Sequence, residues 1–144
     1  MLIINKSWEE LTCSELYAIL QIRAQVFVVE QECPYLDLDD MDQNSRHLFI
    51  IENQIIVAYI RIILEEKRFK IGRVATRKEY RSKGLASALM QAVMNWIKNQ
   101  ESDKKIQLSA QKHLVDFYAQ WGFVSDGKTY LEVGIPHEDM EYQK

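Results

Sequence analysis

The stretch FKIGRVATRKEYRSKGLASALMQAVMNW, residues 69–96, decides the fold of this chain. Its first part, Phe69 to Thr76, is rich in apolar and β-branched residues, which indicates a strand. Its last part carries apolar residues at helical spacing and predicts a helix with one buried face. The residues on that face are Leu85, Ala88, Leu89, Ala92, Val93 and Trp96. A strand that leads directly into a helix indicates a mixed α/β domain.

A basic turn that contains one glycine, Arg81-Ser82-Lys83-Gly84-Leu85-Ala86, joins the strand to the helix. The first amides of a helix lack an intrahelical acceptor and sit at the positive end of the helix dipole, so a phosphate is a natural ligand there. Gly84 keeps side-chain atoms away from such an anion. The turn is neither a Walker loop nor a dinucleotide fingerprint, because the required glycines are missing. Two interpretations stay open: a phosphate site on the amides of residues 82–87, or an ordinary basic loop between a strand and a helix.

The composition is that of a globular protein: of 144 residues, 47% are hydrophobic and 27% are charged. We therefore expect one domain over residues 1–144. The formal net charge of −3 gives no reason to expect nucleic acid as a partner. The sequence shows neither an apolar run long enough to span a bilayer nor a signal peptide, so we expect a cytoplasmic protein without membrane association. Cys13 and Cys33 predict neither a disulfide scaffold nor a zinc site.

The rest of the chain alternates strand-like and helical patterns. Further strands are expected at Met1–Lys6, Leu48–Glu52, Ile55–Leu64, Ile106–Ala110, Phe123–Val124 and Tyr130–Ile135. A capping box at Thr12 predicts the start of a first helix, and Pro34 ends it. A short last helix is expected from His113 to Trp121, with Gly122 as its C-cap. The expected hairpin turns are Asn53-Gln54 and Asp126-Gly127-Lys128.

Charged residues around the first helix admit two readings. Arg23 interrupts the apolar side of that helix, either as an arginine that reaches the surface or as a cation directed into a site. The acidic run Asp37 to Asp42 contains four carboxylates, which either lie in solvent or attract a cationic substrate, with Arg23 and Arg61 as possible internal partners. No metal site is expected here, because the glycine and distal glutamate of a calcium loop are absent.

Several motifs together resemble the GCN5-related N-acetyltransferase (GNAT) superfamily. Arg81-x-x-Gly84-x-Ala86 is similar to its pyrophosphate loop, and Tyr118-Ala119-Gln120-Trp121-Gly122-Phe123 is similar to its Y-x-x-x-G-F segment. The expected order of strands and helices is also that of the superfamily. A closer resemblance, to the ElaA-like branch, extends over nearly the whole chain. It is carried by Arg23-x-x-Val26-Phe27-Val28-Val29-Glu30-Gln31-x-Cys33-Pro34-Tyr35, by the spacing of Asp39, Asp42 and His47, by Leu108-Ser109-Ala110-Gln111, and by Gly134-Ile135-Pro136-His137.

The resemblance implies a central mixed, twisted sheet flanked by helices, and acetyl-CoA as the acyl donor. By carry-over, the residues that would hold the CoA are Val74, Ala75, Thr76, Arg81, Ser82, Lys83, Gly84, Leu85, Ala86, Ser87 and Gln111. Gln111 stands where many members carry asparagine. Tyr118 is the residue that the resemblance makes a hydrogen-bond or proton donor to the CoA sulfur. From the residues alone, the favoured interpretation of Tyr118 is a core tyrosine packed beside Phe117.

The implied reaction is direct attack of an amine on the thioester, with a small molecule or a peptide as the acceptor. Deprotonating a lysine-type amine at pH 7 costs roughly 4 to 5 kcal/mol, whereas an α-amine costs roughly 1 kcal/mol, so a lysine-type acceptor needs a base. The residues expected on the acceptor side are Arg23, Glu30, Asp39, Asp42 and His47, with Glu30, His47 and the aspartates as candidate bases. Two alternatives remain. The first is an enzyme like the acyl-homoserine-lactone synthases, whose charged residues are resembled by Arg23, Phe27, Asp37-x-Asp39-x-x-Asp42 and Arg61. The second is a module that binds acetyl-CoA without turning it over. The sequence does not separate a monomer from a homodimer.

Overall fold

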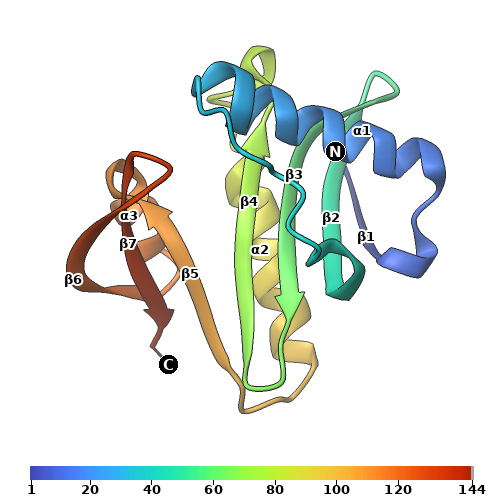
Figure 1. Ribbon diagram of the computed structural model, residues 1–144. Helices are drawn as coiled ribbons and strands as arrows, with labels where there is room; N and C mark the ends of the chain where they lie inside the picture. The colour runs from blue at the N-terminus through green and yellow to red at the C-terminus, as the bar shows by residue number, and fades with distance from the viewer. Residues whose placement is uncertain (144) are drawn as a thin grey trace.

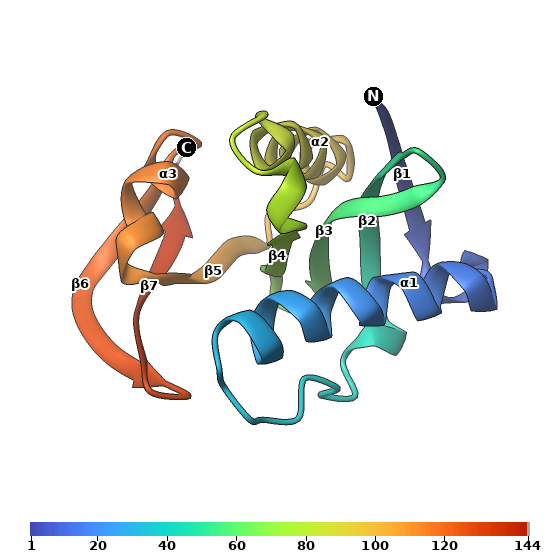
Figure 2. The same cartoon turned by 90° about the horizontal axis from the view of Figure 1, so that it is seen from above.

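The structure, a computed structural model that describes residues 1–143, is a seven-stranded sheet with helices on both faces (Figure 1). The strands are β1 (Leu2–Ser7), β2 (Ser45–Glu52), β3 (Ile55–Leu64), β4 (Arg68–Thr76), β5 (Lys105–Gln111), β6 (Phe123–Glu132) and β7 (Ile135–Tyr142). The helices are α1 (Cys13–Arg23), α2 (Leu85–Asn99) and α3 (Val115–Ala119). Seen from above, α1 covers one face of the sheet, and α2 and α3 cover the other (Figure 2). The expectation of a mixed α/β fold is confirmed.

The sheet order is β1-β2-β3-β4-β5-β7-β6. All neighbours are antiparallel except β4 and β5, which are parallel and are connected through α2. The β1 strand lies at the edge of the sheet, as expected. The β2–β3 hairpin turns at Asn53 and Gln54, whose φ angles are 51° and 66°, the conformation that two-residue hairpins require. Among residues 1–143, no helix combines the length and apolar character needed to cross a membrane.

Each face of the sheet has its own apolar core. The predicted face of α2 is buried through Leu85, Leu89 and Val93, and it packs with strands β2 to β5 in the larger core. On the other face, Ile19 and Ile22 of α1 pack with residues of β2 and β3. The helices are thereby fixed on opposite sides of the strands that border the site described below.

The first helix begins where its capping box predicts. The Thr12 side chain accepts a hydrogen bond from the Glu15 amide at 3.0 Å, and the Glu15 carboxylate accepts one from the Thr12 amide at 2.9 Å. After Arg23 the helix continues as a wider, π-helical segment, Ala24–Glu30. Helix α1 and this segment together bring the chain across the sheet, and the following loop returns in front of β4 and β3 (Figure 1).

The C-terminal hairpin differs from the expectation. Its turn lies at Val133-Gly134, with φ angles of 49° and 77°, so the strand expected at 130–135 is split between β6 and β7. Residues 126–128 are a bulge inside one continuous strand, because the β6–β7 register shifts between Ser125 and Thr129. Gly127 takes φ 75° in that bulge. Positive φ at both turn positions matches the twist of paired strands, even though a valine seldom adopts it.

Strands β4 and β5 pair over only part of their length. Their last paired residues are Ile71 and Leu108, and beyond them the two strands diverge (Figure 1). A bulge in β4 accompanies the divergence: Tyr59 and Arg61 of β3 pair with Ala75 and Gly72, so β4 holds one extra residue. Arg73, within the bulge, has φ 52°. The divergence leaves residues 72–76 without a strand partner on the β5 side, as far as the described residues extend.

Candidate active site

Two cavities meet where β4 and β5 diverge. The first, called here the loop cavity, has a volume of about 650 Å³ and lies beside the turn at residues 81–87. The second, called here the strand cavity, has a volume of about 600 Å³ and lies between β4 and the β5–β7 strands. The residues that line both are Phe27, Gln31, Val74, Gln111, Leu114 and Tyr118. The two spaces therefore form one path from the helix turn to the middle of the sheet.

The turn before α2 has the geometry of an anion site. Gly84 precedes the helix with φ 76°, and Ser82 also has positive φ, 63°. The first bond of the helix runs from the Ala88 amide to the Gly84 carbonyl at 3.0 Å. The amides of residues 85–87 therefore precede the first intrahelical bond and lie at the positive end of α2. A Cβ built on Gly84 meets no atom within 4 Å, so the space in front of the turn is open.

The two basic side chains of the turn are engaged with protein groups. Arg81 forms an ion pair with Glu30 at 2.6 Å and donates from Nε to the Thr76 carbonyl at 3.0 Å. The Lys83 ammonium lies over the Tyr80 ring, 5.2 Å from its centroid. Glu30 was expected on the acceptor side, but it lines the loop cavity and joins the end of the π-helical segment to the turn.

Tyr118 lies at the junction of the two cavities. It is 6% exposed and comes from α3, the helix that holds it against the Phe117 ring in an edge-on contact at 5.1 Å. Burial raises the pKa of its hydroxyl to about 12, because the apolar surroundings disfavour the phenolate. The hydroxyl therefore carries its proton across the physiological pH range and can donate it or a hydrogen bond. Tyr118 therefore both packs against Phe117 and borders the two cavities.

The backbone of β4 borders the same junction. Val74 lines both cavities and Thr76 lines the loop cavity, whereas Ala75 is buried in the core beneath α1. This alternation is that of any strand, and the extra residue at the Arg73 bulge sets which side chains face each side of the sheet. Gln111, at the end of β5, faces the junction from the opposite side.

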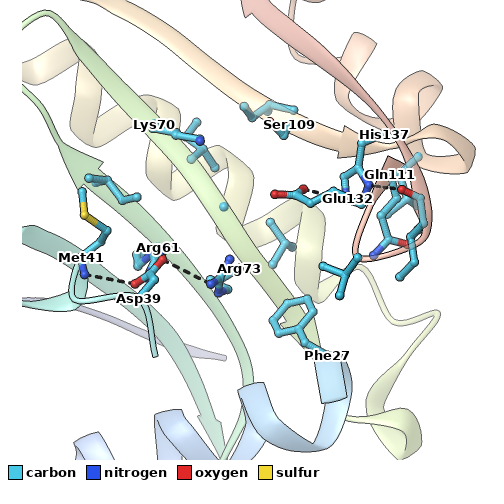
Figure 3. A pocket seen from close by; sticks show the side chains of 18 of the residues that line it. Phe27, Asp39, Met41, Arg61, Lys70, Arg73, Ser109, Gln111, Glu132 and His137 are labelled. Carbon is cyan, nitrogen blue, oxygen red and sulfur yellow. Dashed lines mark hydrogen bonds and ion pairs between the residues drawn. The ribbon is translucent and has the colours of Figure 1, made fainter. Parts of the chain in front are cut away.

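The acidic run is folded against three arginines. Arg23, fully buried, donates to Asp37 at 2.8 Å and to Asp42 at 2.6 Å. Arg61, from β3, donates to both carboxylate oxygens of Asp39 at 2.9 and 2.8 Å and to Asp42 at 3.0 Å. A third partner, which the sequence analysis did not identify, is Arg73: its guanidinium pairs with Asp37 at 2.8 Å and with Asp39 at 3.3 Å. Figure 3 shows Asp39 between Arg61 and Arg73.

The charges in this network balance, with three carboxylates against three guanidinium groups. The guanidinium of Arg61 holds the pKa of Asp39 down, to about 2, against the opposing effect of burial. The pKa of Asp42 is likewise lowered by Arg23 and Arg61, although burial acts in the other direction. Three of the four carboxylates in the run therefore present no unpaired negative charge to an incoming cation. The geometry favours the internal partners over the attraction of a cationic substrate.

His47 lies beneath this network and has no exposed surface. Its Nε2 is 2.9 Å from the Asp42 carbonyl and its Nδ1 is 2.6 Å from the Tyr59 hydroxyl. A carbonyl can only accept, so Nε2 carries the proton, and Nδ1 accepts from Tyr59. Burial lowers the pKa of the imidazole, which keeps it neutral. In this structure neither His47 nor Arg23 reaches either cavity, so both fix the loop rather than face a ligand.

The strand cavity contains polar residues that the sequence analysis quoted only as part of a motif or missed. His137 and Glu132 lie on its β6–β7 side, opposite Lys70 and Arg73 of β4 (Figure 3). Only the Gly134-Ile135-Pro136-His137 segment signalled their position in the sequence. Within residues 1–143, no group of three histidine, cysteine, aspartate or glutamate side chains is arranged to hold a metal ion.

Comparison with known proteins assigns this arrangement to a family. A family model described as the acetyltransferase (GNAT) domain matches residues 16–144. The chain belongs to the GNAT family. Protein ElaA of Escherichia coli (strain K12) is 40% identical over 136 residues, which cover 91% of this chain and 89% of ElaA. The resemblance to the ElaA-like branch is thereby confirmed.

Solved structures of GNAT proteins superpose over the whole fold. The crystal structure of E. coli ElaA has a TM-score of 0.94 and 36% identity, covering 99% of this chain and 100% of that one. An acyl-CoA N-acyltransferase from Pseudomonas aeruginosa has a TM-score of 0.93 and 37% identity, covering 99% of both chains. A CoA-dependent acyl-homoserine lactone synthase, BjaI, superposes with a TM-score of 0.80 but at 16% identity. That last likeness shows the fold alone.

Proposed function

We propose that this protein is an acetyl-CoA-dependent N-acetyltransferase that transfers the acetyl group directly to an amine acceptor. The observation that carries the proposal is the junction at Tyr118. A cavity that begins at a helix N-terminus meets a second cavity beside a buried, protonated hydroxyl. A GNAT relative at 37% identity bears the name acyl-CoA N-acyltransferase, which supports acyl transfer as the reaction class.

In this proposal the loop cavity receives CoA. The amides of residues 85–87 face the pyrophosphate, and Gly84 admits it closely. Arg81 acts by fixing the turn through Glu30 and Thr76, since its guanidinium is already paired. Lys83 adds positive charge beside the phosphates, and Ser82, Leu85, Ala86 and Ser87 complete the lining. The pantetheine arm then runs along the open edge of β4 at Val74 to Thr76, with Gln111 opposite.

The chemistry needs an acceptor placed close to the thioester and a donor for the leaving sulfur. The strand cavity provides the space for the acceptor, on the far side of the junction from the turn. The free amides on the β4 edge stabilise the oxyanion that forms when the amine attacks the carbonyl carbon. Tyr118 donates its proton to the sulfur as the C–S bond breaks.

The test is a CoA-release screen with full-length protein and acetyl-CoA. Acceptors cover simple amines, amino acids, polyamines and peptides with free α- or ε-amines, and propionyl-CoA and hexanoyl-CoA test the acyl length. We expect amine-dependent release of CoA together with an acetylated product by mass spectrometry. Tight binding of acetyl-CoA without turnover by any amine class would instead describe a binding module.

The fold likeness to BjaI does not favour a lactone synthase, because it stands at 16% identity. The charged residues that suggested this alternative, Arg23, Asp37, Asp39, Asp42 and Arg61, form a closed network. These ion pairs hold the loop over the sheet, and they leave few unpaired charged groups that could bind a second substrate.

A further inference from the structure

His137 is placed at the acceptor side of the proposed reaction. It lies on β7, where its Cα pairs with Gln111 of β5 on one side and with Tyr130 of β6 on the other. Directly opposed side chains in an antiparallel sheet share a face and lie about 4.5 to 5.5 Å apart at Cβ. Because Gln111 lines both cavities, His137 stands one strand away from their junction, and it faces the strand cavity (Figure 3).

One ring nitrogen of His137 is hydrogen-bonded to the backbone, and the other can take up a proton. Nδ1 is 2.7 Å from the Ile135 carbonyl, and since a carbonyl only accepts, Nδ1 carries a proton. The ring also stacks on Tyr130, with 6.1 Å between centroids. The remaining nitrogen, Nε2, lies 3.4 Å from the carboxylate of Glu132. The His137 side chain is 10% exposed and that of Glu132 is 54% exposed, so the pair borders the open space.

Of the other candidate bases, Asp39 also lines this cavity, but its carboxylate is held by Arg61 at 2.8 Å and by Arg73 at 3.3 Å. Glu30 lines the loop cavity and is paired with Arg81. His47 is fully buried, and Asp42 is bound by two arginines. Of the three histidines in the chain, only His137 lines the strand cavity. Asp39 is held by two cations and His137 is not, so the geometry favours the imidazole as the base.

Titratable and charged groups from several elements lie near His137 or across the strand cavity from it. They are Glu132 and Tyr130 of β6, Asp139 of β7, Lys70 and Arg73 of β4, Tyr118 of α3, and Cys33, whose thiol approaches the Val133 carbonyl. Tyr130 donates to Asp139 at 2.7 Å and Ser109 donates to the same oxygen at 2.8 Å, which fixes the tyrosine under the ring. Glu132 carries the nearest charge, 3.4 Å from Nε2.

We propose that His137 is the proton acceptor for the amine, with Glu132 stabilising the imidazolium that results; this rests on the proposed acetyl transfer. Nε2 takes one proton from the ammonium form of the acceptor, and the neutral amine then attacks the thioester carbonyl. The C–N bond forms and the C–S bond breaks. The second amine proton is lost as the amide forms and replaces the proton that Tyr118 gives to the sulfur. One proton is released to solvent from His137, so the products are the amide, CoA–SH and H⁺.

The test compares two acceptors that differ in whether a proton must be removed. 2-Phenylethylamine is an ammonium ion at neutral pH, whereas aniline is uncharged. His137→Asn keeps an N–H that can reach the Ile135 carbonyl and removes Nε2. We expect it to lower kcat/KM for 2-phenylethylamine roughly 10²-fold and to change that for aniline less than about twofold. In the variant, the acidic limb of the pH profile with 2-phenylethylamine should lie at higher pH than in wild type, because only the free amine can then attack the thioester.

The matched pair Glu132→Gln and Glu138→Gln separates the role of the carboxylate from a general loss of charge. Glu138 follows His137 but faces Ser125 and Thr129 on the other side of β7, so its variant should behave as wild type. Glu132→Gln should move the acidic limb to lower pH. Equal losses for both acceptors in His137→Asn would overturn the proposal and assign His137 to structure, while amine acetylation itself would stand.

A measurement without turnover covers the case in which neither probe is acetylated. Histidine ¹⁵N spectra of the labelled full-length protein should show the Nδ1-protonated neutral ring at high pH. Acid should convert it to the imidazolium, at a lower pH in Glu132→Gln than in wild type. Two results would overturn the assignment of His137. One is a neutral ring protonated at Nε2, and the other is protonation of the ring at the same pH in Glu132→Gln and in wild type. Failure of the proposed function is read separately, from the CoA-release screen.

Discussion

Replacement of Asp42 by asparagine removes one charge from the buried network while keeping the size of the side chain. Asp42 accepts hydrogen bonds from Arg23 at 2.6 Å and from Arg61 at 3.0 Å. A hydrogen bond to a charged group contributes about 1.5 to 3 kcal/mol and a neutral one about 0.5 to 1.5 kcal/mol. The difference is roughly 1 to 1.5 kcal/mol for each bond. Because an asparagine would still accept from the two cations, two bonds predict a loss of up to about 2 to 3 kcal/mol in the free energy of unfolding.

Two features of the structure bound this value. Loss of one partner from a buried pair costs roughly 3 to 5 kcal/mol when it leaves a charge without compensation. Arg23 keeps Asp37 at 2.8 Å, so the loss should fall below that range. Water cannot replace the lost carboxylate as a partner of the Arg23 guanidinium, because the Arg23 side chain has no exposed surface.

The assay is urea unfolding at neutral pH, with Asp40→Asn as the control. Asp40 lies two residues away in the same loop, is exposed, and has φ 64°, which asparagine tolerates. We expect Asp40→Asn to stay within about 0.5 kcal/mol of wild type. If Asp42→Asn also stays within that margin, the arginines do not depend on its charge and the reasoning fails. In a thermal scan the expected loss corresponds to a lower Tm by roughly 4 to 12 °C.

Three further outcomes follow from the site and the network. Tyr118→Phe should lower kcat roughly 10- to 100-fold with the calorimetric Kd for CoA unchanged, because only the donation to sulfur is lost; a wild-type rate would leave Tyr118 with packing alone. Gly84→Glu should abolish CoA binding by calorimetry, whereas Gly84→Asn, which tolerates the φ of 76°, should weaken it far less; equal loss in both would point to strain in the turn. Asp39 has a folded pKa of about 2, below its ordinary value, so its contribution is present above about pH 4 and is lost as the pH falls toward about pH 2. Asp39→Asn should remove about 1 to 2 kcal/mol of that pH dependence in urea titrations, after allowance for the exposed part of the side chain; an identical acid profile in wild type and variant would contradict the assignment.

The sequence predicted those elements whose signal is local. The apolar spacing of α2, the capping box at Thr12 and the positive-φ turn at Asn53-Gln54 each depend on residues a few positions apart. The turn before α2 belongs to the same class, because a glycine between a strand and an apolar helix is enough to place it. For these elements, the residues that determine the structure lie within the segment that adopts it.

The features that were missed depend on residues far apart in the sequence. Arg73 reaches the acidic run only because a bulge in β4 directs it there, and no local pattern signals that bulge. The C-terminal turn was misplaced because the preferred turn residues, Asp126 and Gly127, occur in a bulge, while a valine occupies the real turn. His137 becomes a site residue through cross-strand pairing with Gln111, a contact that spacing along the chain cannot indicate.

The open edge of β4 also bears on solubility. Unpaired strand edges are templates for pairing with other chains, and this one lies in the middle of a sheet, where β5 has moved away. A pantetheine arm that bonds to this edge would occupy the place of a strand. CoA should then protect the protein from aggregation beyond its effect on Tm, because it covers the edge as well as stabilising the fold by mass action. Light scattering on gentle heating measures this effect, with CoA and with adenosine 3′,5′-bisphosphate, which lacks the pantetheine arm, set to equal fractional saturation. Equal aggregation with the two ligands would exclude it.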